Sequence, residues 1–135
     1  MVQLNGTSDD REQIRELYAR YANYADAVRT DEWVALFTTD GVFESPIYGT
    51  FAGHAALRQF MGQYSASWNG GGVRHMIVNV SFDVRGVAGT GTCGLIYFKV
   101  QDGRSEYQLT GGYNDQLRKV AGEWLFTHRK VYLDG

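Results

Sequence analysis

In residues 73–86, VRHMIVNVSFDVRG, apolar side chains recur at every second position, which predicts one long strand. Three more segments with strand character follow, over residues 87–103, 104–122 and 123–135. The breaks between the segments contain RGVAG, QDGR and KVAGE, which are typical of hairpin turns. The second half of the chain is therefore predicted to be an antiparallel meander.

Segments with helical periodicity come before this meander. Apolar residues recur at helical spacing over residues 7–28, where residues 8–10 offer capping oxygens. A short second helix from residue 30 or 31 is predicted to end at the break TTDG, and two short strands follow over residues 41–53. A third helix is predicted over residues 53–68 and ends at NGGG.

Helices followed by an antiparallel meander indicate an α+β fold. We expect a cone-shaped α+β barrel, in which the N-terminal helices pack into a strongly curved, mostly antiparallel sheet around a hollow centre. Five interior glycines permit that curvature, namely Gly89, Gly91, Gly94, Gly111 and Gly112. Because the chain has no internal repeat, linker or low-complexity segment, residues 1–135 are predicted to form a single domain.

The composition favours an ordinary globular protein, with 44% hydrophobic and 21% charged residues and a net charge of −2. The basic residues form no run, so neither nucleic acid nor a membrane is expected as a partner. The single cysteine excludes an intrachain disulfide. The start, MVQLNGTSDD, lacks the features of a signal peptide, and no apolar stretch reaches the roughly 18–20 residues of a membrane span. The expected location is cytoplasmic.

Three histidines are the candidates for an acid–base group. His54 at a helix start and His128 in the last strand are expected to be structural or exposed. His75 lies near the start of the first long strand, on its more polar face. The opposite face, at alternate positions of residues 76–84, is apolar throughout and is expected to pack. His75 can therefore reach a cavity only near the start of the strand, or if a bulge intervenes.

Asp26 is the carboxylate expected to work with His75. It lies in ANYADAVRTDEW, residues 22–33, on the flank of the apolar helix face. Since the helix dipole disfavours a carboxylate there, the alternative is an exposed residue or a partner for Arg29 or Arg74. A neutral histidine can accept a proton, and a buried carboxylate can hold its tautomer and stabilise the imidazolium. Such a pair suits proton abstraction next to a carbonyl, followed by β-elimination or isomerisation.

Aromatic residues make up 14% of the chain and are expected to form the wall of a binding pocket. The residues expected on this wall are Tyr21, Trp33, Tyr48, Tyr97 and Phe98. Cys93 is expected to fill space in a strand, because GTGTCG lacks the lysine and the following helix of a phosphate loop. Asp26 and His75 have no third ligand beside them in the sequence, so neither a metal nor another cofactor is expected.

Four stretches resemble the SnoaL-like division of the nuclear transport factor two-like superfamily, and the resemblance covers about residues 8–133. They are YARYANYADAVRTDEWVALFTTDGVFE (18–44), YGTFAGHAALRQF (48–60), GVRHMIVNV (72–80) and GEWLFTHRKV (122–131). Members of this division include polyketide cyclases, scytalone dehydratase, bile acid dehydratase and hexachlorocyclohexane dehydrochlorinase. The resemblance implies one SnoaL-like domain over residues 1–135.

The resemblance also implies roles for single residues. Asp26 stands ten residues before an LF pair, as the family's catalytic aspartate does, and His75 lies on the strand that carries its catalytic histidine. In the dehydratase and dehydrochlorinase branches the histidine is the base and the aspartate orients it. Tyr21 matches the bile acid dehydratase branch but replaces a lysine of the dehydrochlorinase. Residues 97–98 replace a second histidine of scytalone dehydratase, so neither of those two specific activities is implied.

Two classes of function follow. The leading one is a cofactor-independent lyase or isomerase of dehydratase type, acting on a small hydrophobic or aromatic ring compound. The alternative is a non-catalytic ligand-binding or oligomerisation module of the same fold, and polyketide cyclase-like activity stays open as well. The late strands carry Val, Tyr and Phe on both faces, so a homodimer or higher homo-oligomer is expected.

Overall fold

The computed structural model describes residues 4–135, so the first three residues of the predicted domain lie outside the described part. In chain order its elements are α1 Ser8–Asp26, α2 Thr30–Val34, β1 Phe37–Ser45, β2 Gly49–Ala52, α3 His54–Ala66, β3 Gly72–Arg85, β4 Ala88–Gln101, β5 Arg104–Val120 and β6 Glu123–Leu133. Two-residue turns join β3 to β4, β4 to β5 and β5 to β6, which confirms the three predicted hairpins.

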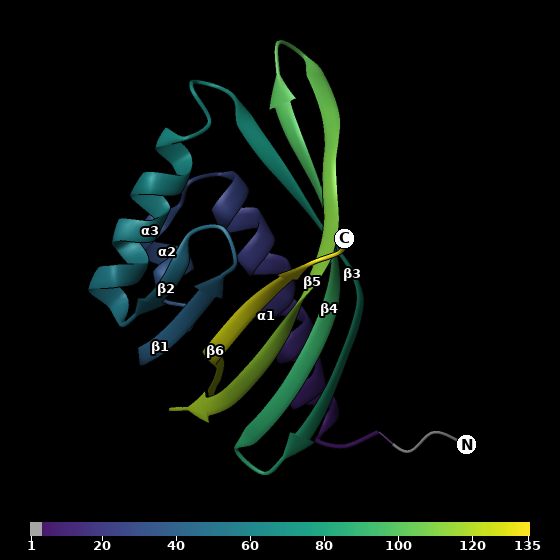
Figure 1. The fold of residues 1–135 in the computed structure, drawn as a ribbon. Helices are drawn as coiled ribbons and strands as arrows, with labels where there is room; N and C mark the ends of the chain where they lie inside the picture. The colour runs from purple at the N-terminus through teal and green to yellow at the C-terminus, as the bar shows by residue number, and fades with distance from the viewer. Residues whose placement is uncertain (1–3) are drawn as a thin grey trace.

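The strands form one sheet in the order β2-β1-β6-β5-β4-β3. β1 pairs with β6 in parallel, and every other neighbouring pair is antiparallel. The sheet is strongly curved but does not close, and the helices lie on its concave side (Figure 1). The predicted α+β class and the curved, mostly antiparallel sheet are therefore confirmed.

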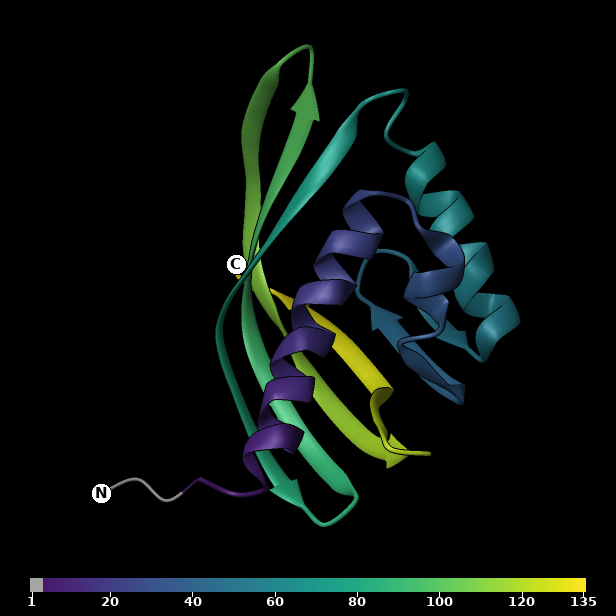
Figure 2. The same ribbon diagram turned by 180° about the vertical axis from the view of Figure 1, so that it is seen from behind.

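Helix α1 is capped by Thr7, one residue before the predicted capping positions. The Thr7 hydroxyl accepts from the backbone N–H of Asp10 at 3.0 Å, and the Asp10 carboxylate accepts from the N–H of Thr7 at 3.4 Å. The helix then runs along the sheet, while α2 and α3 lie at the end near β1 and β2 (Figure 2). The buried face of α1 includes Ile14, Leu17, Tyr18, Tyr21, Ala22 and Ala25.

Asp10 also ties the start of α1 to the β5–β6 hairpin. Its Oδ1 atom accepts from Nε1 of Trp124 at 3.0 Å and from Nζ of Lys119 at 2.9 Å. These hydrogen bonds, that of Trp124 first, hold the pKa of the Asp10 carboxyl well below its ordinary value of 3.8. The native state therefore binds a proton here less readily than the unfolded chain does.

We expect Asp10 to contribute to acid denaturation. Because its folded pKa is depressed, its contribution is present above the unfolded value and is lost as the pH falls through the folded value. Between about pH 5 and pH 2, the free energy of unfolding of the wild type should fall more steeply than that of Asp10→Asn. Denaturant unfolding measures both, with Asp9→Asn as the exposed control from the same helical turn. Equal slopes for wild type and Asp10→Asn would contradict this role.

The start of β1 differs from the prediction. Helix α2 ends at Val34 and β1 already begins at Phe37, so the predicted break TTDG lies inside a strand. The cause is the pairing with β6, where Phe37 lies opposite Phe126 and Val42 lies opposite His128, with a register shift between them. A parallel partner from the other end of the chain leaves no local signal in the sequence.

A β-bulge divides β3, because its register with β4 shifts between Val78 and Ser81, and Asn79 has φ +55°. Before the bulge, His75 faces the interior and Met76 is 46% exposed. Beyond it, the opposite parity packs on the core, with Val80, Phe82 and Val84. The prediction that the whole apolar face packs is therefore wrong at Met76. A bulge, one of the two conditions under which His75 was expected to reach a cavity, is present in β3.

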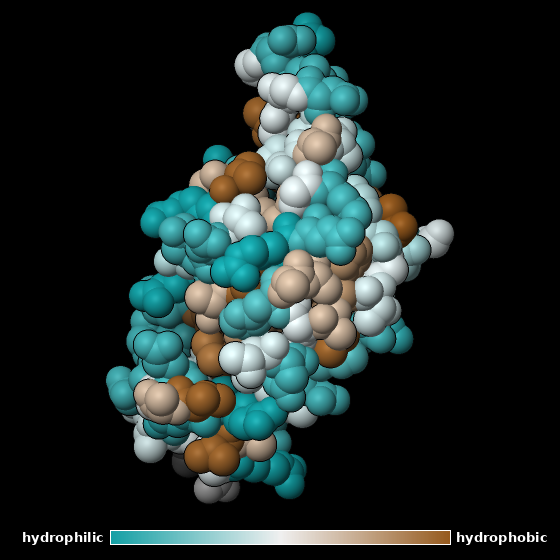
Figure 3. Space-filling model, turned by 90° about the vertical axis from the view of Figure 1, so that its left-hand side faces the viewer, coloured by the Kyte–Doolittle hydropathy of each residue, from teal (hydrophilic) through white to brown (hydrophobic). Residues whose placement is uncertain are grey.

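The face of the molecule that carries the helices is mainly hydrophilic, and its apolar residues appear in small separate groups (Figure 3). Two exposed apolar residues, Ile47 and Tyr48, lie in the turn between β1 and β2 and border an interior cavity. Between residues 4 and 135, no helix has the length and apolarity needed to cross a bilayer.

Candidate active site

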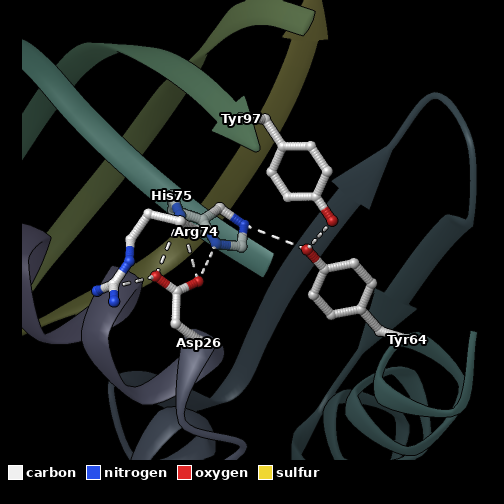
Figure 4. Close-up of polar contacts among 5 residues, drawn as sticks. All are labelled: Asp26, Tyr64, Arg74, His75 and Tyr97. Carbon is white, nitrogen blue, oxygen red and sulfur yellow. Dashed lines mark hydrogen bonds and ion pairs between the residues drawn. The ribbon is translucent and has the colours of Figure 1, made fainter. Parts of the chain in front are cut away.

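The side chains of Asp26 and His75 meet although the two residues are 49 positions apart in the chain. Asp26 ends α1, and His75 lies near the start of β3. Nδ1 of His75 is 2.5 Å from Oδ1 of Asp26 (Figure 4). The backbone N–H of His75 also donates to the carboxylate, at 3.3 Å from Oδ1 and 3.1 Å from Oδ2. Asp26 thus holds both the strand and the ring of His75.

Both side chains are shielded from bulk water, with exposed fractions of 7% for His75 and 9% for Asp26. The helix dipole disfavours a carboxylate at the end of α1, and the hydrogen bonds from His75 offset that cost. Arg74 adds little, because its Nη1 atom is 4.0 Å from Oδ2 and its side chain is 61% exposed. Arg29, the other basic partner considered, pairs with Glu32 instead.

The contact with Asp26 orients the imidazole ring. Because a carboxylate accepts the hydrogen bond of Nδ1–H, the hydrogen-bond network assigns the proton of the neutral ring to Nδ1 and a lone pair to Nε2. Nε2 lies 3.4 Å from the hydroxyl oxygen of Tyr64 (Figure 4). The nitrogen that can accept a proton is therefore on the side of the ring away from Asp26.

A cavity lies beside His75, between the helices and the sheet. Its volume is about 630 Å³, the open mouth included. Its lining is mainly aromatic and aliphatic, and the polar side-chain groups among the lining residues are those of His75, Ser45, Trp33 and several tyrosines. Cavities of this character suit small, largely apolar ligands that are fixed by a few polar groups.

Four of the five aromatic residues predicted for the pocket wall line this cavity, namely Tyr21, Trp33, Tyr48 and Tyr97. Phe98 does not, because successive residues of a strand point to opposite faces. Its ring packs near that of Tyr107 instead, with 6.4 Å between the ring centroids. The placement predicted for Phe98 is therefore wrong, and the binding role of the other four stays a prediction.

Tyr64 on α3 is a site residue that was not predicted. Its hydroxyl oxygen lies 2.7 Å from that of Tyr97, in addition to its contact with His75 (Figure 4). Burial raises the pKa of Tyr64 and of Tyr97, so both side chains stay phenols. The only sequence signal was the helical spacing that turns Tyr64 inward together with Phe60 and Met61.

A buried ion pair lies behind the cavity and was also missed. Nε of Arg129 is 3.0 Å from Oδ1 of Asp115, and both side chains are 0% exposed. The Tyr18 hydroxyl donates to Oδ2 of Asp115 at 2.6 Å, and a Cβ at Gly91 would collide with that hydroxyl. The guanidinium lies 3.7 Å from the ring centroid of Tyr113, which lines the cavity. The pair therefore supports the cavity wall from behind.

A bulge explains why Arg129 points inward. Strict alternation from the buried Phe126 would turn Arg129 outward, since Arg129 lies three positions further along the strand. The register of β5 with β6 shifts so that Leu117 lies opposite Phe126 and Gln116 lies opposite His128, which skips one residue of β6. The shift restores the inward direction for Arg129, and no local pattern in the sequence announces it.

Burial and the charge pair together shift the pKa values of this cluster. It raises the pKa of Asp115, because the charge of Arg129 offsets only part of the lost hydration. Burial acts the opposite way on Arg129, yet the nearby charge of Asp115 leaves the pKa of that guanidinium raised. Burial also raises the pKa of the surrounding phenols, Tyr18, Tyr21 and Tyr113. The phenols therefore stay protonated.

The other candidates from the sequence have structural surroundings. Nε2 of His54 lies 2.9 Å from the carbonyl oxygen of Phe37, and Nε2 of His128 lies 3.2 Å from a carboxylate oxygen of Glu44. Cys93 is buried, which raises the pKa of its thiol to about 11 and keeps it from being a thiolate. In the described part of the chain, no three His, Cys, Asp or Glu side chains are grouped to hold a metal ion.

Solved structures with the same fold include two from Novosphingobium aromaticivorans. One is an NTF2-like protein with a cystatin-like fold, 25% identical, with a TM-score of 0.85 over 93% of this chain and 82% of that one. The other is named only as a candidate aromatic ring hydroxylase and is 25% identical, with a TM-score of 0.80 over 97% of this chain and 96% of that one. Both likenesses extend over nearly the whole of this chain.

A protein from Catenulispora acidiphila, solved in complex with S-DNPA, shares the fold at 20% identity, with a TM-score of 0.84 over 95% of this chain and 96% of that one. A search of curated proteins finds no match. The profile of the SnoaL-like domain matches residues 6–130, nearly the span over which the resemblance was seen in the sequence. The chain therefore belongs to the SnoaL-like domain family.

Proposed function

We propose that the protein is a cofactor-independent lyase or isomerase of dehydratase type that acts on a small, largely apolar ring compound. The observation that carries this proposal is the 2.5 Å contact between Nδ1 of His75 and Oδ1 of Asp26 at the wall of the cavity. An imidazole held in this way can accept a proton from a bound compound without help from a metal or another cofactor.

In the proposed reaction His75 is the base, and Asp26 orients its ring and stabilises the imidazolium that forms. Removal of a proton next to a carbonyl leaves an electron pair, which either expels a group from the β carbon or shifts the double bond. Because both side chains are shielded from water, the attraction between imidazolium and carboxylate is stronger than at the surface. General acid–base catalysis of this kind contributes about 10²–10⁴-fold to a rate.

The substrate class follows from the wall of the cavity. Its aromatic residues, among them Tyr21, Trp33 and Tyr48, offer flat apolar surface to a ring. The cavity volume of about 630 Å³, the open mouth included, suits a compact compound of one ring or two fused rings. The S-DNPA complex of the Catenulispora protein supports a ligand site in a relative of this fold.

The alternative, a module that binds a ligand without changing it, requires neither Asp26 nor His75. The burial of the carboxylate and its three contacts with His75 favour the enzyme, because an uninvolved carboxylate would gain more from hydration at the surface.

A homodimer and a cytoplasmic location stay predictions. The exposed side chains of Met76 and Tyr132 on the sheet support self-association.

We expect Asp26→Asn to slow proton transfer by at least about 10²-fold, because the amide cannot stabilise the imidazolium. The measurement is deuterium uptake by cyclohexanone in D₂O, followed by NMR, because exchange of its α protons requires only a base in the cavity. Asp31→Asn, at a carboxylate whose side chain is 82% exposed, is the matched control and should keep the wild-type rate. Wild-type exchange by a folded Asp26→Asn variant would contradict the proposed role.

A further inference from the structure

Two phenol hydroxyls, of Tyr64 on α3 and Tyr97 on β4, meet beside the ring of His75 (Figure 4). Their oxygens are 2.7 Å apart, and the Tyr64 oxygen is 3.4 Å from Nε2 of His75. Each hydroxyl has one proton to donate. One proton serves the bond between the phenols, so one is left for a third acceptor.

The protonation state of His75 decides where that proton goes. When Nε2 has a lone pair, it accepts from the Tyr64 hydroxyl, and Tyr64 accepts from Tyr97. When Nε2 gains a proton it becomes a donor, and the Tyr64 oxygen becomes the acceptor. The proton of Tyr64 must then turn to another oxygen. Because burial keeps both residues as phenols, the exchange passes protons on and stores no negative charge.

We infer that Tyr64 is the catalytic residue that passes a proton from His75 to the departing oxygen of a β-hydroxy carbonyl compound. This inference rests on the proposed function. The C–H bond next to the carbonyl breaks as the proton moves to Nε2, and its electron pair forms the new C=C bond. The C–O bond breaks, and the oxygen leaves with its electron pair and the Tyr64 proton, as water. Tyr64 recovers a proton from Nε2, which restores the starting state.

The geometry also sets the stereochemistry. The accepting nitrogen and the Tyr64 oxygen are 3.4 Å apart on one wall of the cavity. The hydrogen that is lost and the hydroxyl that leaves must then lie on the same face of the substrate ring and on neighbouring carbons. The substrate class is therefore a cyclic β-hydroxy ketone that undergoes syn elimination.

The test compares two reactions of small probes in the same protein. The first is α-proton exchange of cyclohexanone, which needs His75 but no departing oxygen. The second is dehydration of 3-hydroxycyclohexanone to cyclohexenone, followed by its ultraviolet absorption. Tyr64→Phe should lower dehydration by about 10²-fold more than it lowers exchange, because only dehydration uses the Tyr64 proton. Tyr97→Phe, which keeps the Tyr64 hydroxyl, should lower dehydration less.

The control is Tyr107→Phe, at a tyrosine that is 60% exposed and does not line the cavity; both rates should stay at wild-type values. Equal loss of both reactions in Tyr64→Phe, or loss of neither, would overturn the relay. A wild-type protein that catalyses exchange but not dehydration would also overturn the relay, although the proposed function would stand. A wild type that catalyses neither reaction would remove the proposed function itself.

A deuterium label checks the face of attack. 3-Hydroxycyclohexanone is prepared with one deuterium on the carbon between the carbonyl and the alcohol carbon, either cis or trans to the hydroxyl. The relay predicts that the first cyclohexenone formed has lost the cis label and kept the trans label. Loss of the trans label would contradict the placement of Tyr64 as the proton donor.

Discussion

We expect replacement of His75 with alanine to lower α-proton exchange of cyclohexanone by about 10²–10⁴-fold, down to the rate without protein. The expected loss is large because the other two histidines lie elsewhere. His54 contacts the backbone of Phe37, and His128 contacts Glu44. Neither lines the cavity, so neither can take the place of Nε2. NMR of deuterium uptake measures wild type and variant under one set of conditions.

The matched control for this loss is His128→Ala, which removes an imidazole whose side chain is 35% exposed. This variant should exchange at the wild-type rate. Circular dichroism and thermal melting show that each variant is folded. A folded His75→Ala protein that exchanges as fast as the wild type would show that the base is another group.

The second large effect concerns stability. We expect Arg129→Met to lower the free energy of unfolding by about 3–5 kcal/mol, because it leaves the Asp115 carboxylate buried without its counter-charge. Both side chains are 0% exposed, so water cannot compensate in the native state. The rings of Tyr21 and Tyr113 would also lose the guanidinium that lies 4.0 Å and 3.7 Å from their centroids. Denaturant unfolding of the two proteins measures the difference.

The control is the double variant Asp115→Asn with Arg129→Met. It removes both charges, keeps an oxygen that accepts from Tyr18, and should recover most of the lost stability. If the double variant is as unstable as Arg129→Met, the lost stability comes from packing and not from the unpaired charge. An Arg129→Met variant as stable as the wild type would contradict the role of the buried charge pair.

The sequence predicted those parts of the fold that depend on local periodicity. The helical spacing of residues 7–28 and the alternation from residue 73 onward gave the α+β class and the hairpins. The start of β1 at Phe37 was not predicted, because its partner is β6 from the other end of the chain. A strand that depends on a distant partner has little local pattern of its own.

The same reason limits what the sequence could say of the site. Asp26 and His75 were named from the residues and the resemblance, but their contact depends on how α1 crosses the start of β3. The inward direction of Arg129 depends on a bulge, which reverses the alternation that a sequence pattern assumes. The helical spacing of Tyr64 indicates that its side chain points inward, yet nothing in the sequence showed that its hydroxyl reaches His75.

The proposed chemistry requires that Asp26 hold the ring of His75 so that Nε2 accepts protons from the cavity. Nitrogen-15 NMR of the histidine side chains reports this arrangement, and only three histidines need to be assigned. We expect the neutral ring of His75 to carry its proton on Nδ1, and the Nε2 signal to shift in Tyr64→Phe but not in Tyr107→Phe. A His75 ring that carries its proton on Nε2, or that is unaffected by Asp26→Asn, would contradict it.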